Sequence, residues 1–460
     1  MYRKTNRIYQ AEKAFGQDRK EQVGLKNKKK TDLRSGAKAA AEKPISNIDK
    51  NDKAVILARM HEIKKYKDDI SSTQNTIGYT QMFKDGVCQI DDHRFSKTIQ
   101  FFDTNYQLAE FEEQNGIFSK YCDLINYFDN TVTFQLTFEN QNRSQDGLVK
   151  QIQIPAQEDD FNEIRAEYSE MLTSKLLSGK NGQSCRKFLT FTIEASSYKQ
   201  AKPKLLNIQT EIIKMFKGFN VEAKALSGKE RLETLYYSLN PFQSAPFVFD
   251  WNEMLKAGWN TKDFIAPSSM KFNKANFEIG ASFGAINGMN ILAGELPDTI
   301  LSDFLELQHL FCVNLHVTPL DQITALKFVK TKLTAVESMK IDEQKKASKA
   351  GYDPDILPPA IKMYITDLEK LLDDLNSKNE RLFHISITIR NYARNKKDLG
   401  LQLELLKRIC QKNNCTLMPC DYLQEDYLSS SLPLGINKIQ VSREMHTSGI
   451  AIFVPFTTQE

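Results

Sequence analysis

Apolar and polar residues alternate along two short stretches at the start of the patterned part of the chain. Residues 86–90 and 95–102 alternate on either side of the polar turn Asp91-Asp92-His93, which predicts a β-hairpin. Apolar residues then recur at helical spacing over 117–128, and residues 132–138 alternate again as a strand. The predicted order is strand, strand, helix, strand.

Helices and strands continue to alternate up to residue 241. The pattern predicts a helix over 160–179, a strand over 188–194 and a second helix over 203–217. A strand over 220–226 and a helix beginning near Lys229 complete this half. In the first of these helices five apolar residues share one face: Phe161, Ile164, Tyr168, Met171 and Leu172.

A similar order recurs in the second half. Residues 277–283 alternate, Asn287-Gly288 is typical of a two-residue hairpin turn, and 289–292 is the predicted return strand. A helix over 297–309 and a strand over 312–317 follow.

Two long helical stretches then interrupt the alternation. They cover 320–349 and about 360–379, and a segment rich in proline, 351–359, separates them. Four further elements follow in chain order: strand 382–390, helix 398–411, strand 415–419 and an apolar β-type run over 449–456.

These elements predict an α+β protein with two subdomains of related plan, in which ββαβ units are followed by αβαβ-like units. The first would cover 76–241 and the second 242–460, with an inserted helical hairpin over about 320–379. Such a hairpin usually packs on its own sheet, and the alternative is an arm that docks a partner. The length of 460 residues agrees with more than one domain, since single cores stop growing at about 250–300 residues.

The positive charge is concentrated before the patterned region. Residues 1–50 hold 14 Lys and Arg against 6 Asp and Glu, whereas the whole chain carries only +4. Residues 1–75 are therefore predicted to form a basic, largely disordered tail. Contact with anionic lipid or nucleic acid is one interpretation of this tail, and a solvated tail without a ligand is the other. The charge peaks at four lysines, Lys26, Lys28, Lys29 and Lys30.

Composition excludes some classes of protein. The chain is 41% hydrophobic and 26% charged, and it has no apolar run near the ~18–20 residues that cross a bilayer. The basic N-terminus also lacks the apolar core of a secretory signal, so we expect a cytoplasmic location. Seven cysteines, odd in number and mostly far apart, argue against a disulfide framework.

Several separated stretches resemble a known family. They are residues 76–90 (TIGYTQMFKDGVCQI), 97–109 (KTIQFFDTNYQLA), 353–358 (DPDILP) and 379–383 (NERLF). Together they are similar to the N-terminal half of conjugal transfer ATPases, the VirB-type (CagE-, TrbE- and TraE-like) proteins of type IV secretion systems. The resemblance extends over about 76–460.

The resemblance implies the role of the whole protein. Members of the family assemble at the cytoplasmic face of the inner membrane and power conjugal transfer through a RecA-like motor domain that binds ATP and Mg²⁺. That domain would lie beyond residue 460, because the chain stops soon after the run at 449–456. We therefore expect a docking and scaffold region that is peripheral at the membrane, contacts inner-membrane components of the apparatus and forms homo-oligomers as part of the full-length protein.

The sequence departs from the family in the motif that binds the phosphates of ATP. A P-loop needs the string G-x-x-x-x-G-K-[ST], and no such string occurs in the 460 residues. Residues 179–184 and Ser227-Gly228-Lys229-Glu230 share its composition without its spacing, so we interpret them as a loop and a helix start. ATP hydrolysis by this chain alone is not expected, and we predict no catalytic, cofactor-binding or metal-binding residue in it.

Other candidate chemistry is weak. Gly280, Gly284 and Gly288 are spaced for close strand packing rather than for a nucleotide loop. Glu306 and His309 would share one helical face, which is half of a di-metal pair, and a structural role is the preferred interpretation.

The late cysteines and one strand face complete the candidates. Cys410, Cys415 and Cys420 lack a paired C-x-x-C and are interpreted as buried thiols rather than zinc ligands. Strand 382–390 is predicted to expose a polar face, either as a contact surface or as a solvated side. That face carries His384, Ser386, Thr388 and Arg390.

Three hypotheses follow. The leading one is the docking region of a conjugation ATPase. The alternative is a free-standing nucleic-acid-binding or adaptor protein that uses the basic N-terminal arm. A small-molecule enzyme of another type ranks third, because no convergent catalytic set is present.

Overall fold

The structure is a computed structural model. It describes residues 72–104, 106, 109–142, 161–178, 183–243, 245–292, 296–297, 299–307, 309–353, 356–439 and 441–456. The described residues belong to one compact unit, Ser72–Glu460. The predicted basic tail, with Lys26, Lys28, Lys29 and Lys30, lies outside the described residues except for its last four positions, where helix α3 (Thr73–Thr76) begins.

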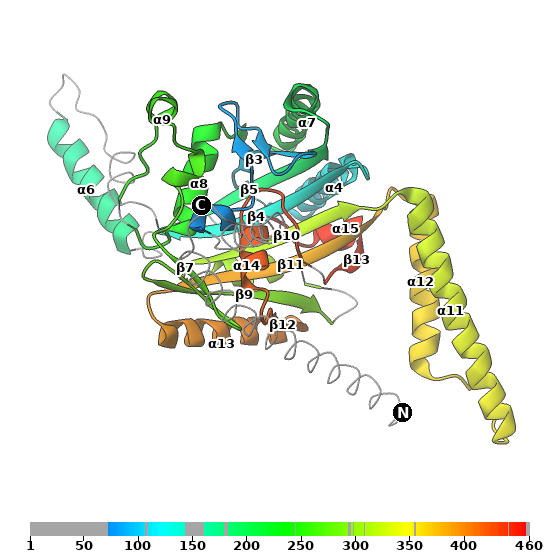
Figure 1. The fold of residues 1–460 in the computed structure, drawn as a ribbon. Helices are drawn as coiled ribbons and strands as arrows, with labels where there is room; N and C mark the ends of the chain where they lie inside the picture. The colour runs from blue at the N-terminus through cyan, green and yellow to red at the C-terminus, as the bar shows by residue number, and fades with distance from the viewer. Residues whose placement is uncertain are drawn as a thin grey trace, which may run out of the picture. The chain divides into compact units, whose positions relative to one another are not determined.

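Helices and antiparallel strands alternate through the described part, so the predicted α+β class is confirmed (Figure 1). The elements of the first half are, in chain order, β1 (Gln81–Met82), β2 (Cys88–Gln89), β3 (Arg94–Phe101), α4 (Phe111–Tyr127), β4 (Val132–Asn142), α6 (Asn162–Ser178), β5 (Gln183–Glu194), α7 (Tyr198–Gly218), β6 (Ala223–Ala225) and α8 (Gly228–Leu239).

The second half begins after α9 (Trp251–Ala257) and the 3-10 turn η3 (Thr261–Phe264). Its elements are β7 (Met270–Phe272), β8 (Phe277–Ile279), β9 (Ser282–Ile291), α10 (Ile300–Leu305), β10 (Phe311–Pro319), α11 (Gln322–Lys349), α12 (Pro359–Ser377), β11 (Leu382–Ala393), α13 (Lys396–Lys412), β12 (Cys415–Pro419), α14 (Gln424–Ser431), β13 (Arg443–His446) and α15 (Thr447–Ala451).

Strand pairing repeats one plan in the two halves. In the first, the order across the sheet is β6-β3-β5-β4, and in the second it is β12-β9-β11-β10. Both halves thus have the strand order of a β-α-β-β-α-β unit. The strands β4 and β10 pair with each other, with Leu136 opposite Leu315, so one sheet runs through both halves.

Each half carries an insertion between its second and third strands. In the first half this stretch contains α6, and in the second it is the helical hairpin α11–α12. Because β4 and β10 are antiparallel, the end of β4 lies beside the start of β10. The two insertions therefore leave the sheet at opposite ends, as Figure 1 shows.

One face of the sheet is apolar and carries the main core. Helices α4, α7, α10, α13 and α15 each contribute buried residues to a cluster that spans both halves. Within it Phe101 stacks on Phe216 at 5.0 Å between ring centroids, and Phe456 meets Tyr121 and Phe219 edge-on at 6.1 and 5.8 Å. The last described segment of the chain thus packs into the core of the first half.

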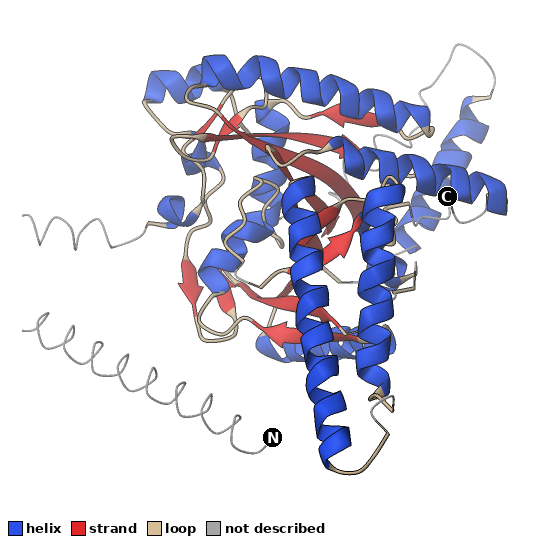
Figure 2. Cartoon of the chain, turned by 90° about the vertical axis from the view of Figure 1, so that its right-hand side faces the viewer, coloured by secondary structure: helices blue, strands red, loops and turns tan. Residues whose placement is uncertain are grey.

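The hairpin α11–α12 extends away from the sheet (Figures 1 and 2). Only its base has a core, where Ala325 and Val329 of α11 pack with Leu375 of α12 and Leu382 of β11. The expectation that the hairpin packs on its own sheet therefore applies to this base alone.

The predicted turn at Asn287-Gly288 is wrong. These residues lie inside β9, where Asn287 pairs with Ile389 of β11 and Pro419 of β12. The turn lies instead at Gly280, whose φ of 55° favours glycine, between Ile279 and Ser282. Two flanking strands hold β9 extended and override the local turn preference.

The predicted β-type run at 449–456 is also wrong in its first part. Residues Thr447–Ala451 form helix α15, and no strand is assigned from there to residue 456. A short apolar run does not distinguish a strand from a buried helix, and here Ile450, Ala451 and Phe453 are buried in the main core.

Replacement of Phe456 by alanine tests this packing. Phe456 is 1% exposed, so Phe456→Ala should lower the free energy of unfolding by about 3–5 kcal/mol through lost burial and a residual cavity. Urea denaturation followed by circular dichroism measures the change. Val248→Ala is the control, because Val248 is 76% exposed and should change stability by less than about 0.5 kcal/mol. Equal effects of the two changes would contradict the packing.

Candidate functional site

The second face of the sheet is polar and is nonetheless buried. Period-two alternation places apolar residues of the central strands on the core face and hydroxyl, amide and charged residues on the other. Those on the polar face that are at most 5% exposed include Ser96, Thr98, Gln135, Thr137, Glu139, Thr190, Thr192, Asn314, His316, Ser386, Thr388 and Arg390. A buried polar group is costly unless it is hydrogen-bonded, so this face needs partners.

The prediction that β11 exposes its polar face is therefore wrong for three of its four residues. Ser386, Thr388 and Arg390 are buried, and only His384 keeps a partly exposed side chain. The reason is a chain segment far away in sequence: α14 and the residues after it lie over this face.

We call residues 429–437 the covering segment, since their backbone supplies the partners. Gln135 donates to the carbonyls of Ser430 (3.2 Å) and Leu432 (3.0 Å) and accepts from the amide of Gly435 (3.0 Å). His316 donates through Nε2 to the Ser430 carbonyl at 2.8 Å. Gln135 and His316 together thus make four hydrogen bonds to the backbone of the covering segment.

Glycine is required where the covering segment lies closest to the sheet. Gly435 has φ of 78°, and a Cβ added to it would lie 2.1 Å from Oγ1 of Thr192. That hydroxyl donates to the Gly435 carbonyl at 3.3 Å. A side chain here would separate the covering segment from β5.

A buried ion pair joins the two halves beneath the covering segment. Arg390 of β11 contacts Glu139 of β4 at 2.5 Å, and the side chains are 1% and 5% exposed. Arg390 also donates to the hydroxyl of Ser431 (2.9 Å), and Glu139 accepts from the hydroxyl of Ser238 at 2.8 Å. This pair of charges therefore joins the first half, through β4 and α8, to the second half, through β11 and the covering segment.

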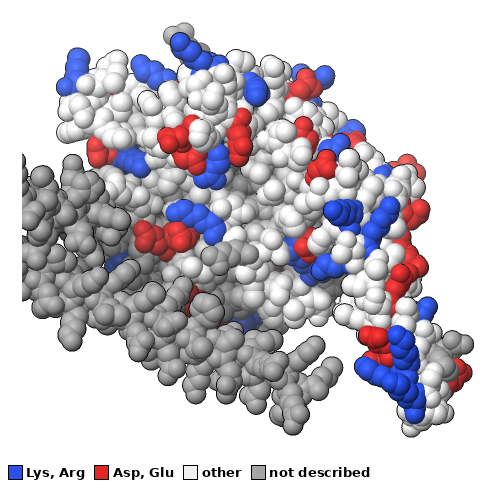
Figure 3. Space-filling view, turned by 45° about the vertical axis from the view of Figure 1, so that its right-hand side comes forward, with Lys and Arg blue, Asp and Glu red and all other residues white. Residues whose placement is uncertain are grey.

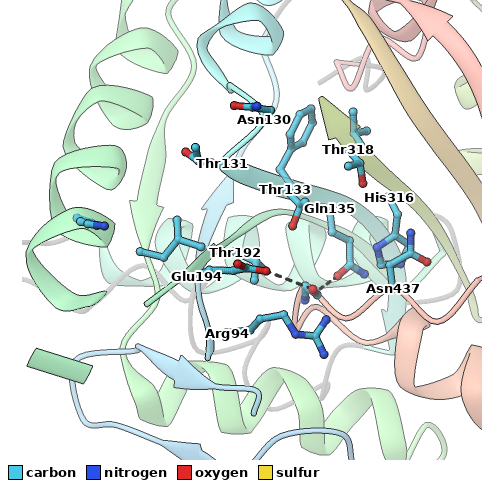
Figure 4. Close-up of a pocket in the computed structure, with 15 residues that line it drawn as sticks. Arg94, Asn130, Thr131, Thr133, Gln135, Thr192, Glu194, His316, Thr318 and Asn437 are labelled. Atoms are coloured by element: carbon cyan, nitrogen blue, oxygen red, sulfur yellow. Dashed lines mark hydrogen bonds between the residues drawn. The ribbon is translucent and has the colours of Figure 1, made fainter. Parts of the chain in front are cut away.

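A pocket of about 590 Å³ lies on the polar face (Figure 4). It lies at one side of the covering segment, over the ends of β4, β5 and β10. Its polar lining residues are Arg94, Asn130, Thr131, Thr133, Gln135, Thr192, Glu194, Lys204, His316, Thr318 and Asn437. Figure 4 shows Thr192 and Gln135 hydrogen-bonded to the covering segment at the pocket floor.

The pocket lining carries charges of both signs. Arg94 holds Asp91 through a 2.6 Å bond, and Glu194 adds a negative charge to the cations Arg94 and Lys204 in the lining. Burial lowers the pKa of His316 to about 4, against the opposing hydrogen bond to Ser430, so the imidazole is neutral at pH 7. A neutral imidazole that already donates to a carbonyl offers hydrogen bonds to a polar ligand rather than charge.

The segment that shares its composition with a P-loop is a helix start, as interpreted. Ser227 is the N-cap of α8, and the Glu230 carboxylate returns to the Ser227 amide at 2.8 Å, which makes a capping box. A Cβ on Gly228 would lie 2.1 Å from the Phe83 carbonyl oxygen. The amide and the hydroxyl of Ser227 are therefore already bonded to the Glu230 carboxylate. The other such segment, 179–184, lies mostly outside the described residues.

Gly284 and Gly288 differ in their reasons for lacking a side chain. A Cβ on Gly284 would lie 2.3 Å from the ring of Phe277, in agreement with close strand packing. At Gly288 a Cβ would make ordinary contacts with Met418 and Cys420.

Glu306 and His309 do not share a helical face. Helix α10 ends at Leu305, and His309 contacts Asn391 at 3.3 Å and Phe311 edge-on. The paired-ligand geometry that a helix would have supplied is therefore missing.

The late cysteines are buried and do not converge. Cys410 and Cys415 lie in the main core, whereas Cys420 belongs to a cluster under α14, and burial raises the pKa of each thiol. Across the described ranges, no group of three or more His, Cys, Asp or Glu side chains could hold a metal ion. In the same ranges no helix is long and apolar enough to cross a bilayer.

No protein-family model matches the chain, and a search of curated proteins finds no match. The class of protein therefore rests on the fold and the site. It is an α+β protein with two repeated halves, a polar sheet face covered by a segment distant in sequence, and a projecting helical hairpin.

The sequence did not indicate the pocket, because threonine and glutamine on a strand are typical of a solvent-exposed face. The run Ser429-Ser430-Ser431 before Pro433 and Gly435 is the one signal that could have indicated a covering segment.

Removal of one partner of the buried ion pair should destabilise the fold. Glu139→Gln or Arg390→Met alone leaves an unpaired charge and should cost about 3–5 kcal/mol. The double change should cost less than the sum of the two, because no buried charge is left. Chemical denaturation of the three variants measures this coupling, and additive losses would contradict it.

Acid should weaken the fold through His316. Its pKa is about 4 in the fold and about 6.5 when unfolded, so the unfolded chain binds the proton first. The contribution of neutral His316 is complete above pH 6.5 and is lost as the pH falls from 6.5 to 4, on the order of 3 kcal/mol. Stability measured across this range in the protein and in His316→Gln should show a smaller pH dependence for the variant. Identical slopes would contradict the assignment.

Proposed function

We propose that this chain is the docking and scaffold region of a conjugal transfer ATPase of a type IV secretion system. It would act at the inner face of the membrane, hold the motor to inner-membrane components of the apparatus and leave ATP hydrolysis to a RecA-like domain. The sequence resemblance over 76–460 supports the family. The hairpin α11–α12 is the observation that carries the docking role.

The hairpin has the features of a contact arm. The structure describes both of its helices in full, and beyond Val329 of α11 and before Leu375 of α12 none of their residues is buried. Four large apolar side chains in this distal part are 49–59% exposed: Met339, Ile341, Met363 and Tyr364. These side chains are exposed and are available for contact with another protein.

Two of the stretches that carry the resemblance lie at the hairpin. Residues 353–358 form most of the connection between α11 and α12, and 379–383 lead from α12 into β11. The arm and the sequence likeness therefore involve the same part of the chain.

Transfer of DNA between cells tests the proposal. In a strain that carries the gene, deletion should abolish conjugal transfer, and the intact gene should restore it. A gene in which a Gly-Ser linker replaces residues 323–377 should not restore transfer, because the arm is missing. A gene carrying Val248→Ser is the control, since Val248 is exposed outside the arm. Normal transfer by the deletion strain would refute the proposal.

ATP hydrolysis gives a second readout. The purified chain should release no phosphate from ATP above the blank, because no P-loop string occurs in the 460 residues and the segment at Ser227 is a capped helix start. Measured turnover that survives repeated purification would contradict this assignment of roles.

A further inference from the structure

The pocket on the polar face lies beside the end of the covering segment. Gly435 and Asn437 of that segment belong to its lining, and most of the other lining residues come from β4, β5, β10 and the residues next to them. Its volume of about 590 Å³ falls in the range of about 300–1,000 Å³ that small-molecule sites occupy. The pocket therefore has the size of a ligand site.

Three threonines form a row across this pocket. Thr192 of β5 is opposite Thr133 of β4. The pairing of Phe134 with Val317 brings Thr133 level with Thr318 of β10. Neighbouring strands lie about 4.8 Å apart, so the row presents hydroxyls at that spacing on one face. The hydroxyls of Thr133 and Thr318 have no partner among the described residues.

His316 adds an acceptor that the fold leaves open. Its Nε2 donates to the Ser430 carbonyl at 2.8 Å, and a neutral imidazole carries a single proton, so Nδ1 is an acceptor. The side chain is 4% exposed and lines the pocket, and its Nδ1 has no partner among the described residues. A buried acceptor without a partner is costly, so a donor from a ligand would stabilise this arrangement.

Asn437 supplies a donor on the same side of the pocket. Its Oδ1 accepts from the Ile439 amide at 2.9 Å, which leaves the two hydrogens of Nδ2 for another partner. Figure 4 shows Asn437 and His316 together on one side of the pocket and Glu194 and Thr131 on the other.

The charges of the lining balance. Asp91 holds Arg94 at 2.6 Å, and Lys204 and Glu194 are opposite in sign. Figure 3 shows a similar mixture of signs on the face that it draws. A ligand with a phosphate group would meet the Lys204 ammonium together with the Glu194 carboxylate, and repulsion by the second offsets attraction by the first. The balance favours a ligand without net charge.

We propose that this pocket binds a short neutral saccharide. A sugar hydroxyl donates and accepts at the same oxygen, so it can pair with Thr133 and Thr318 in either role. It can also donate to Nδ1 of His316 and accept from Nδ2 of Asn437. Because these groups lie on neighbouring strands and on the covering segment, one ligand with several hydroxyls meets them together. The inference is independent of the docking role proposed for the arm and adds a ligand site on the sheet.

Isothermal titration calorimetry of the full chain tests the ligand class. The probes are four neutral disaccharides: maltose, cellobiose, lactose and N,N′-diacetylchitobiose. At least one should bind, and its affinity should be the same at low and high salt, because no charge on the ligand is involved. Adenosine monophosphate and arginine are the charged comparisons and should bind more weakly.

Loss of the open hydroxyls tests the site. Thr133→Val with Thr318→Val removes two hydrogen bonds with little change in shape and should weaken binding about tenfold. Thr366→Val is the matched control, because Thr366 is exposed on α12 away from the pocket, and it should bind as the unmodified protein does. Thr318→Trp fills the pocket and should abolish binding. Circular dichroism without ligand verifies that each variant is folded, and Thr318→Trp decides if the double variant is not.

Three outcomes would overturn the inference. They are a panel in which no disaccharide binds, binding that survives in the folded pocket variants, and a charged comparison that binds more tightly than every disaccharide. A strong salt dependence of the binding would likewise contradict a neutral ligand.

Discussion

The fold depends on the hydrogen bonds between the polar face of the sheet and residues 429–437. Gln135, His316, Thr192 and Arg390 come from four different strands, and each finds its partner on this one segment. Such groups would cost free energy if they were buried alone, whereas with carbonyl and amide partners they fix where the segment lies. The apolar face has no comparable specificity, since apolar packing is largely non-directional.

This constraint also explains how the two repeated halves act as one structure. The β4–β10 pairing makes the sheet continuous, but the Glu139–Arg390 pair and the covering segment join the halves on the polar side. On the apolar side Phe456 returns to Phe101 and Phe219 of the first half. The last part of the second half thus contacts both faces of the sheet in the first half. Beyond its base, the hairpin α11–α12 stays outside this arrangement.

Local signals in the sequence were enough for elements that form from their own residues. The capping box at Ser227 and Glu230 marks the start of α8, and Ile385, Ile387 and Ile389 mark the core face of β11. Signals failed where distant segments decide the outcome. Asn287-Gly288 favours a turn until β11 and β12 hold it extended, and Thr388 and Arg390 read as solvent-facing until residues 429–437 cover them. The pocket shares this origin, because Gln135 and Gly435, which are hydrogen-bonded in its lining, are 300 residues apart in the sequence.

The position of the covering segment late in the chain has a consequence for folding. Thr98 and Pro433, which share a hydrogen bond, are separated by 335 residues, so this contact is among the most non-local in the protein. Non-local contacts form slowly, and domains made on the ribosome begin to fold from the N-terminus. During synthesis the first half therefore meets water with a sheet face made of threonine, serine and glutamine. A polar face can be hydrated until residues 429–437 are made, whereas an apolar face in its place would be exposed to other nascent chains during that time.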